Sequence, residues 1–279
     1  MNLNDAQQLL ANVSQKMPIW EEYRANISSS KIYYDAQHQP SALLVFSTNQ
    51  FHPHALGIAV YALSSDMFSI ILNDAIQEVG RQHKDRLVIW EYRPFSPFTE
   101  WLLTQGFSVW RETVSPNAQL ADIALPTSNT TEGQILTTAD IQANHPLKTQ
   151  LIEMSLADYR QVHTINPMAV TTPAQWEQIV FPDVLSDAPM AFIKHNQITA
   201  YTFPFEDIPG IFTFGWLGAT DSTALWTLQA AQIQWAKNRG MVGLSGEFDG
   251  TDPLALATYR HWPFAPAPVY TMVGKKIKN

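Results

Sequence analysis

Side chains able to accept or donate a proton occur at three places in the C-terminal half of the sequence. Tyr259 lies in DPLALATYRHWPF, residues 252–264, which has the pattern of a short helix that ends at Pro-Phe. Glu247 follows a run typical of a buried strand, and His163 lies in a helical run further upstream. Phenol, carboxylate and imidazole groups are those that general acid–base catalysis uses. Each also has a structural explanation, as a packed ring, a solvated carboxylate at a strand end and a packed or surface histidine.

Several other chemistries are excluded by what the sequence lacks. There are no cysteines, which excludes disulfides, thiolate metal sites and a cysteine nucleophile. Neither a Walker-type glycine loop nor a Gly-x-Ser-x-Gly elbow occurs. His52 and His54 lie close together in FHPHA, but no further ligands with metal spacing accompany them, so no metal site is predicted.

Composition indicates a globular protein with an acidic surface. The chain has 279 residues, of which 46% are apolar, enough for two domains with real cores. A net charge of -8 and the lack of a basic stripe argue against a nucleic-acid partner. No apolar run approaches the roughly 20 residues that cross a bilayer, so no membrane association is expected. The polar stretch of residues 1–20 lacks the pattern of a signal peptide, which favours a cytoplasmic location.

The elements that must position these residues follow the same order in the two halves of the chain. The first half predicts a hairpin, a strand, an amphipathic helix, a strand and a short helix, at residues 31–47, 54–63, 66–83, 86–92 and 98–107. The second half predicts two helices and then the same series ending in a last strand, at residues 151–167, 172–181, 190–203, 210–219, 223–240, 241–248, 252–262 and 268–277.

The spacing of these elements predicts a duplication. Phe107 and Phe264 lie 157 positions apart (264 − 107), as do the expected starts of the long helices, Asp66 and Thr223 (223 − 66). Between the halves, the Thr/Ser-rich stretch of residues 126–138 has the composition of a linker. The sequence therefore predicts two domains, residues 1–130 and 131–279.

The element order and the stretch from Tyr259 to Phe264 resemble the GCN5-related N-acetyltransferase (GNAT) family, in which a helix carrying a tyrosine ends at Gly-Phe before the last strands. DPLALATY is similar to that family's Asn-x-x-Ala-x-x-Leu-Tyr run, with Asp252 at the asparagine and Tyr259 at the tyrosine. YRQVHTINPM and TPAQWEQIVF are similar to the paired helices of tandem GNAT proteins. The resemblance implies an α+β fold with two domains, each a mixed, mostly antiparallel sheet flanked by helices.

The resemblance also implies a reaction, the transfer of an acyl group from acetyl-CoA or another acyl-CoA to a small amine or a peptide amine. It implies that Tyr259 protonates the departing thiolate and that a backbone N–H near residues 216–218 polarises the carbonyl. Glu247 is the candidate base, acting through water. His163 lies in the helix pair that covers the acceptor site in related proteins. Two alternatives stay open for Glu206 and Asp207, loop charges or groups that face a cationic amine.

One GNAT motif departs from the family pattern. The loop that holds the pyrophosphate of coenzyme A has the form Gln/Arg-x-x-Gly-x-Gly/Ala, and it falls here on TDSTAL, residues 220–225, without the cation or the glycines. Helix N–H groups and three hydroxyls could still bind phosphate, whereas capping by Asp221 or Ser222 needs no ligand. The candidate cofactor-binding residues are Trp216, Leu217, Gly218, Thr220, Ser222, Thr223, Ala224, Leu225 and Asp252.

The corresponding positions of the first half lack this chemistry. Asp66 would repel a pyrophosphate at the start of the long helix, and Leu102 stands where the second half has Tyr259. The first half is therefore expected to be a structural partner. Two functions stay open for the second half, an acyl-CoA-dependent N-acyltransferase and a non-catalytic GNAT-like binding or regulatory protein.

Overall fold

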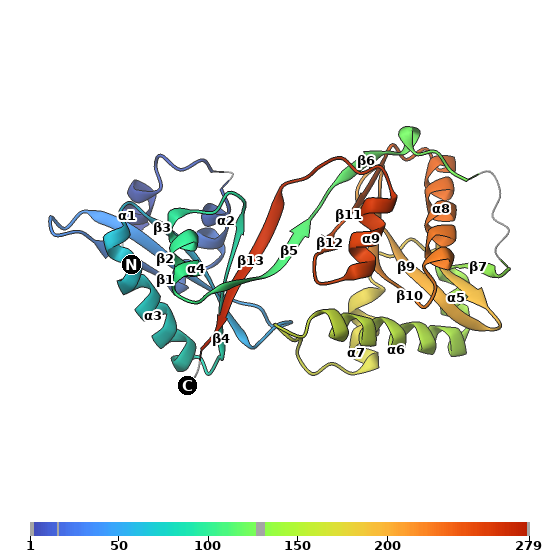
Figure 1. Cartoon of the computed structure of the whole chain (residues 1–279), viewed down its shortest axis with the longest axis horizontal. Coiled ribbons are helices and arrows are strands. Elements are labelled where there is room, and N and C mark those ends of the chain that lie inside the picture. The colour runs from blue at the N-terminus through green and yellow to red at the C-terminus, as the bar shows by residue number, and fades with distance from the viewer. Residues whose placement is uncertain (1–2, 16, 127–131, 278–279) are drawn as a thin grey trace. The chain divides into compact units, whose positions relative to one another are not determined.

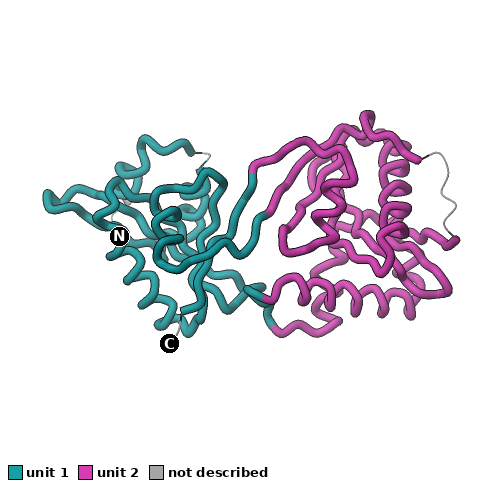
Figure 2. The backbone as a smooth tube through the Cα atoms, in the orientation of Figure 1, with its two compact units in different colours: residues 1–112, 165–169, 269–279 teal, residues 113–164, 170–268 magenta. Residues whose placement is uncertain are grey.

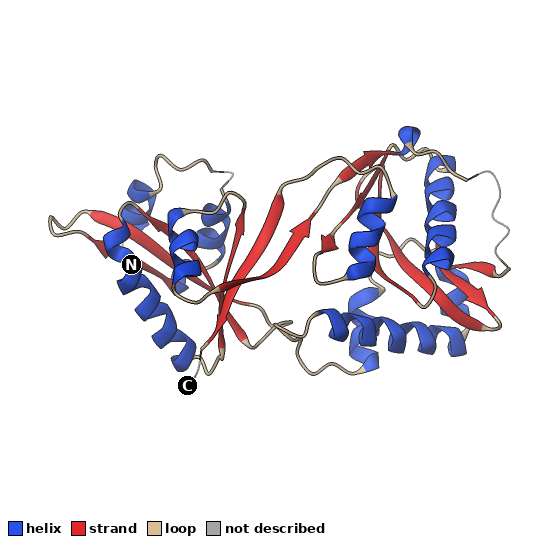
Figure 3. Cartoon of the chain, in the orientation of Figure 1, coloured by secondary structure: helices blue, strands red, loops and turns tan. Residues whose placement is uncertain are grey.

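The structure is a computed structural model that describes residues 3–15, 17–126 and 132–277 (Figure 1). The chain forms two compact units (Figure 2). Unit 1 contains Met1–Glu112, Ile165–Ala169 and Val269–Asn279, and unit 2 contains Thr113–Thr164 and Val170–Pro268. Each unit has a mixed sheet flanked by helices (Figure 3), which confirms the predicted fold class.

In unit 1, the strands follow the order β1-β2-β3-β4-β13-β5. β3 and β4 are parallel, whereas β1 with β2, β2 with β3, and β4 with β13 are antiparallel. The elements are α1 (Leu3–Leu9), α2 (Pro18–Ala25), β1 (Ser30–Tyr34), β2 (Pro40–Thr48), β3 (Ala55–Ala62), α3 (Phe68–Arg81), β4 (Arg86–Tyr92), α4 (Pro97–Thr104), β5 (Ser108–Val114, entering unit 2 at Thr113) and β13 (Val269–Lys276).

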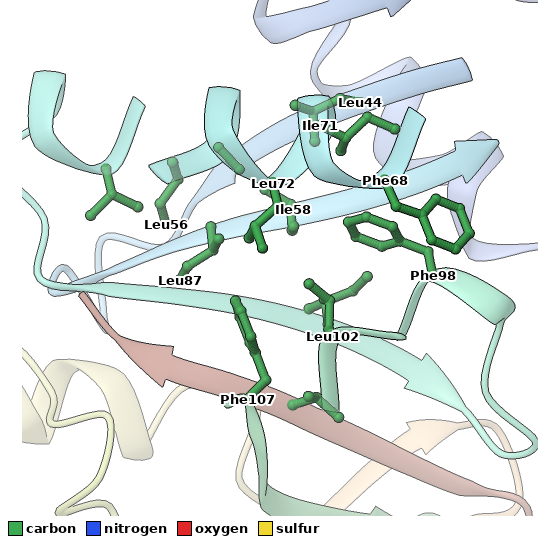
Figure 4. Packing of buried hydrophobic residues seen from close by; sticks show 14 of the residues in the cluster. Leu44, Leu56, Ile58, Phe68, Ile71, Leu72, Leu87, Phe98, Leu102 and Phe107 are labelled. Carbon is green, nitrogen blue, oxygen red and sulfur yellow. The ribbon is translucent and has the colours of Figure 1, made fainter. Parts of the chain in front are cut away.

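Both faces of this sheet are buried, which explains the continuous apolar run in β2. Successive side chains of a strand point to opposite faces. Accordingly, Ala42 and Leu44 pack in the cluster that contains α3 and α4 (Figure 4), and Leu43 and Val45 pack against α1 and α2. The helical spacing predicted for residues 66–83 is confirmed, because the buried side chains of α3 lie on one face of the helix, at Phe68, Ile71, Leu72, Ala75 and Val79.

In unit 2, a sheet of order β6-β11-β10-β9-β8-β7 is mostly antiparallel, with β10 and β11 parallel. Its elements are β6 (Asn117–Gln119), β7 (Gln134–Thr137), α5 (Thr138–Ala143), α6 (His145–Val162), α7 (Pro173–Val180), β8 (Pro189–Lys194), β9 (Gln197–Ile208), β10 (Ile211–Ala219), α8 (Ser222–Asn238), β11 (Gly243–Gly246), β12 (Phe248–Asp249) and α9 (Pro253–His261). β12 pairs with the end of β5, at Thr113 and Val114.

The two faces of the unit 2 sheet carry different helices. Ala200 and Leu217 pack against Leu225 of α8, in a cluster of buried hydrophobic side chains. On the other face, the Tyr201 hydroxyl bonds to Asp158 of α6, and Trp216 contacts Trp176 of α7. The predicted pair of helices is thus confirmed, and it covers the face on which Trp216 lies.

The units do not follow the predicted boundary near residue 130, which itself lies outside the described residues. The last strand, β13, pairs with β4 in unit 1, from Tyr270↔Tyr92 to Lys276↔Arg86. Conversely, β6 precedes residue 130 and pairs with β11 in unit 2. The unpaired hydrogen-bonding groups on a strand edge can be paired by a strand from any part of the chain. Val273 of β13 is buried in the core of unit 1. Hence the second half of the sequence contributes its last strand to the first unit.

The pairing of β13 with β4 predicts which unit is destabilised by a substitution in the last strand. Val273→Asp places a carboxylate in the unit 1 core, at a cost of several kcal/mol, whereas Lys276→Asp changes an exposed residue of the same strand. Hydrogen exchange should accelerate in β4 and α3 of the Val273 variant and stay unchanged in α8 and β11. Acceleration confined to α8 and β11 would contradict the assignment.

Candidate active site

The parallel strands at the centre of unit 2 separate part-way along their length. β10 and β11 pair from Ile211↔Gly243 to Phe214↔Gly246. β10 then continues to Ala219, with its other edge paired to β9. Beyond Phe214, no described strand pairs with the edge of β10 that faced β11. Backbone groups on this edge therefore have no ladder partner, and N–H groups there can polarise a carbonyl oxygen.

A β-bulge lies at this point of separation. Phe214 pairs with Pro204 and Leu217 pairs with Thr202, so three steps along β10 match two along β9. The extra residue shifts the alternation of side chains. As a result, both Phe214 and Leu217 pack in the clusters that contain α8, while Trp216 turns to the opposite face. The predicted residues Trp216, Leu217 and Gly218 all belong to this bulged segment.

Asp158 of α6 lies against the bulged segment, and sequence reasoning missed it. The Tyr201 hydroxyl donates a hydrogen bond of 2.8 Å to Asp158 Oδ2. Gly218 stands opposite Tyr201 in the β9–β10 ladder, and a Cβ atom there would overlap both the carboxylate and the Tyr201 ring. The absence of a side chain at Gly218 thus lets the carboxylate approach the backbone of β10.

Two further carboxylates are linked to Asp158 by electrostatic interactions. The charge of Asp252 acts on Asp158, and the charge of Asp249 acts on Asp252. Burial raises the pKa of the Asp158 carboxyl above its usual range, the charge of Asp252 raises it further, and the Tyr201 hydrogen bond opposes both. Burial also raises the pKa of Asp252, with Asp249 adding to the rise, while backbone N–H groups and His163 lower it. Asp158, Asp252 and Asp249 thus form an acidic cluster, which favours positive charge nearby.

His163 lies beside this group, and its expected place at an acceptor site stays a prediction. It caps the C-terminus of α6, stacks on the Tyr159 ring at 3.9 Å, and its Nδ1–H donates to the Tyr159 carbonyl at 2.8 Å. Its Nε2 lies 3.6 Å from Asp249 Oδ2, and Asp249 also accepts a hydrogen bond from the Thr113 hydroxyl. The imidazole is therefore fixed beside a carboxylate.

Tyr259 lies on α9, whose N-cap, Asp252, belongs to the acidic cluster. Asp252 is the N-cap and accepts hydrogen bonds from Leu254 N and Ala255 N, at 2.8 and 3.1 Å. Its carboxylate therefore has a capping role beside the predicted cofactor role. Two turns further on, the Tyr259 ring stacks on Phe248 at 5.7 Å. Among the described residues its hydroxyl has no hydrogen-bond partner.

Two predicted carboxylates occupy other places. Glu247 is exposed in the connection between β11 and β12. Glu206 is exposed near the β9–β10 turn, where its Oε1 accepts a hydrogen bond from Gly210 N at 2.7 Å. Glu206 is five residues along β9 from Tyr201, or roughly 17 Å at the rise of a strand. Glu206 is therefore not brought together with Asp158, and it stabilises a turn.

The N-terminus of α8, the predicted pyrophosphate site, is capped by a carboxylate. Asp221 Oδ1 accepts a hydrogen bond of 2.9 Å from Thr223 N. The backbone N–H of Thr220 and its hydroxyl both donate to the carbonyl of Thr199. Ala224 and Leu225 are buried in the core, so only their backbone is available. Capping by Asp221, one of the two explanations that the sequence left open, is present.

The matching region of unit 1 is built differently. β3 and β4 also part after Ile58↔Ile89, but β3 keeps an unbroken register with β2 from Leu56 to Ala62, without a bulge. Leu102, at the position of Tyr259, is fully buried in the core. Ser64 caps the helical turn before α3 and donates a hydrogen bond to Asp66.

Within residues 3–15, 17–126 and 132–277, no group of three or more histidine, aspartate or glutamate side chains could hold a metal ion. None of the described helices is long and apolar enough to cross a membrane.

Comparison with solved structures gives this architecture a family resemblance. No protein-family model matches the sequence, and no curated protein matches it. A GCN5-related N-acetyltransferase from Sphaerobacter thermophilus has a TM-score of 0.54 at 12% identity, over 90% of this chain and 81% of that one. A tandem GNAT protein from the clavulanic acid biosynthesis pathway has a TM-score of 0.55 at 10% identity, over 99% and 95%. The chain has the fold of a tandem GNAT protein.

The same fold occurs in a protein of unknown function from Staphylococcus epidermidis, with a TM-score of 0.55 at 10% identity, over 92% of this chain and 98% of that one. At such identities the similarity establishes the GNAT fold. It therefore confirms the resemblance read from the sequence as a resemblance of fold, and the site must be argued from its own residues.

The raised pKa of Asp158 predicts a pH-dependent effect on stability. A carboxyl with a raised pKa in the folded state stabilises the fold below the ordinary value of 3.8 and loses this contribution as the pH rises through the folded pKa. Asp158→Asn should therefore gain stability relative to the wild type between pH 3 and pH 7, measured by chemical denaturation.

Asp140→Asn is a control of opposite sign. Hydrogen bonds from Thr137 lower the pKa of Asp140, so its contribution is present above 3.8 and is lost as the pH falls. The Asp140 variant should lose stability relative to the wild type between pH 3 and pH 7. If both variants moved in the same direction, the environment assigned to Asp158 would be incorrect.

Proposed function

We propose that unit 2 is an N-acyltransferase that moves the acyl group of an acyl thioester, such as acetyl-CoA or another acyl-CoA, to a small amine or a peptide amine. The observation that carries the proposal is the bulged edge of β10 with the Asp158 carboxylate against it. Acyl transfer to an amine needs a donor to the carbonyl oxygen, a base for the amine and an acid for the thiolate. Unit 2 has candidates for all three, and unit 1 lacks the bulge and the tyrosine.

The residues of unit 2 fit one part of an acyl-CoA and not another. A bound acyl-CoA supplies an activated acyl group, whose C–S bond breaks as the amine nitrogen forms the new C–N bond. The backbone of Trp216 and Gly218 would hold the acyl carbonyl through N–H donors on the open edge. The pyrophosphate does not fit the N-terminus of α8, because the Asp221 carboxylate already occupies it.

Asp158 replaces Glu247 as the proposed base. An amine is mostly an ammonium ion at neutral pH and must lose a proton before it attacks. Asp158 Oδ2 is held by Tyr201, which leaves Oδ1 to take the proton. Burial raises the pKa of this carboxyl, which makes it a stronger base, and Asp252 and Asp249 favour a cationic acceptor. Glu247, by contrast, is exposed to solvent.

Replacement of Asp158 tests the base directly. Asp158→Asn should keep the Tyr201 hydrogen bond and lower kcat by roughly 10² to 10⁴, the usual effect of losing a general base. Glu153→Gln, an exposed carboxylate of the same helix, is the matched control and should keep full turnover. The assay would use a panel of amines at saturating acetyl-CoA. Full turnover by the Asp158 variant, or a loss confined to Glu247→Gln, would return the role to Glu247.

Tyr259 is the proposed acid. Its ring packs on Phe248, so Tyr259→Phe removes a hydroxyl and keeps the packing. Because a thiolate is a fairly good leaving group, we expect kcat to fall by about 10², with donor affinity and thermal stability unchanged. Undiminished turnover by this variant at matched donor saturation would leave Tyr259 with a packing role alone.

A non-catalytic binding function is the second candidate, and the Asp221 cap favours it. That cap removes a donor on which the GNAT resemblance relies for coenzyme A. A calorimetric titration separates the two functions when it is combined with the amine panel. Binding of a thioester without turnover of any amine would support the non-catalytic function.

A further inference from the structure

We infer that Asp221 makes the donor site of unit 2 indifferent to the pyrophosphate of coenzyme A, so that the acyl-pantetheine part supplies the affinity. The inference rests on the proposed acyltransferase function and names its donor class, an acyl-pantetheine thioester. Asp221 is then a specificity-determining residue, which weakens the contribution of any anion beyond the pantetheine arm.

Asp221 caps the N-terminus of α8. α8 begins at Ser222, and Asp221 has the extended backbone of an N-cap, with φ of -140° and ψ of 114°. Its carboxylate accepts the Thr223 N–H, one of the few backbone donors that a helix N-terminus offers to an anion. The same donor would otherwise be available to a phosphate oxygen. The carboxylate therefore competes for the position that a pyrophosphate needs.

β9, β10 and the N-terminal part of α8 carry no basic residue. The sequence contains no lysine or arginine between Lys194 and Lys237, a stretch that includes β9, β10 and nearly all of α8. Lys237 lies in the last turn of α8, at the far end from Asp221. A pyrophosphate at the N-terminus would thus face a like charge with no basic residue on these elements to offset it.

The side of α8 that faces α9 is held by ring stacking and by hydrogen bonds of an amide side chain. His261 of α9 stacks on Trp226 of α8 at 4.3 Å, with the rings nearly parallel. Burial lowers the pKa of His261, which disfavours the charged imidazolium that would attract a phosphate. Thr258 of α9 and Trp262, which follows α9, also bond to the buried Gln229 of α8, and these bonds hold the two helices together. This side of α8 therefore presents rings and amides.

The bulged edge of β10 has the features that binding of a thioester needs. The bulge in β10 and the open edge after Phe214 leave backbone donors for a thioester, and the absence of a side chain at Gly218 lets the Asp158 carboxylate lie beside them. Unit 2 therefore has backbone donors for a thioester on the edge of β10, and a carboxylate where the pyrophosphate of coenzyme A would bind. A donor that binds through its pantetheine thioester satisfies both observations.

The test is calorimetric titration of the full chain with acetyl-CoA and with S-acetylpantetheine, which lacks the pyrophosphate and the nucleotide. For the wild type we expect dissociation constants that agree within about threefold. Asp221→Asn keeps a good capping side chain and removes the charge, and should strengthen acetyl-CoA binding about tenfold while leaving S-acetylpantetheine unchanged. Asp207→Asn, an exposed aspartate near the β9–β10 turn, is the control and should change neither constant.

Other results would overturn the inference. These are wild-type binding of acetyl-CoA more than tenfold tighter than that of S-acetylpantetheine, an Asp221→Asn variant that folds with unchanged acetyl-CoA affinity, or no binding of either thioester. The proposed function fails separately. Equal binding of both thioesters without turnover of any amine sinks the acyltransferase and keeps the inference, whereas turnover with a strong preference for acetyl-CoA does the reverse.

Discussion

The parallel pairing of β10 with β11 ends at Phe214↔Gly246, and the candidate site depends on that ending. Had the ladder continued, the edge of β10 from residue 215 to 219 would have been covered by strand partners. The bulge beside it turns Trp216 toward α7, and Gly218 lets Asp158 lie against the strand. Unit 1 has the same separation of strands after Ile58, but its regular β3 carries no bulge. The two units thus share a fold and differ in the feature on which the proposed chemistry depends.

Much of the fold could be predicted because its signals are local. The helical spacing of α3 and α8, the hairpins and the buried strands are properties of short segments, and the structure has them where the sequence placed them. The partner of β13 could not be predicted in this way. A run such as VYTMVG states that a strand is buried on both faces but not which sheet edge it joins, so its place beside β4 depends on tertiary structure.

The site was less predictable, because its residues come from separate elements. A motif drew attention to Tyr259 and to the start of α8, and a helical run drew attention to His163, which lies beside Asp249. Asp158 left a weaker signal. It continues the buried face of α6 that runs through Leu151 and Ser155, at helical spacing, so a carboxylate there marks either a buried bond or a site. Glu247 and Glu206 looked equally suitable by type, but Glu247 is exposed between β11 and β12 and Glu206 is exposed near the end of β9.

The central claim is that one unit alone holds an acyl-donor site, on the open edge of β10. Hydrogen exchange of the full chain, with and without saturating S-acetylpantetheine, tests this most directly, because a ligand protects the backbone that it contacts and stabilises. The account predicts protection of residues 215–219 and of α9, with no change in β3 or β4. Protection of residues 59–62 and 90–92 of unit 1, with none in β10, would contradict it.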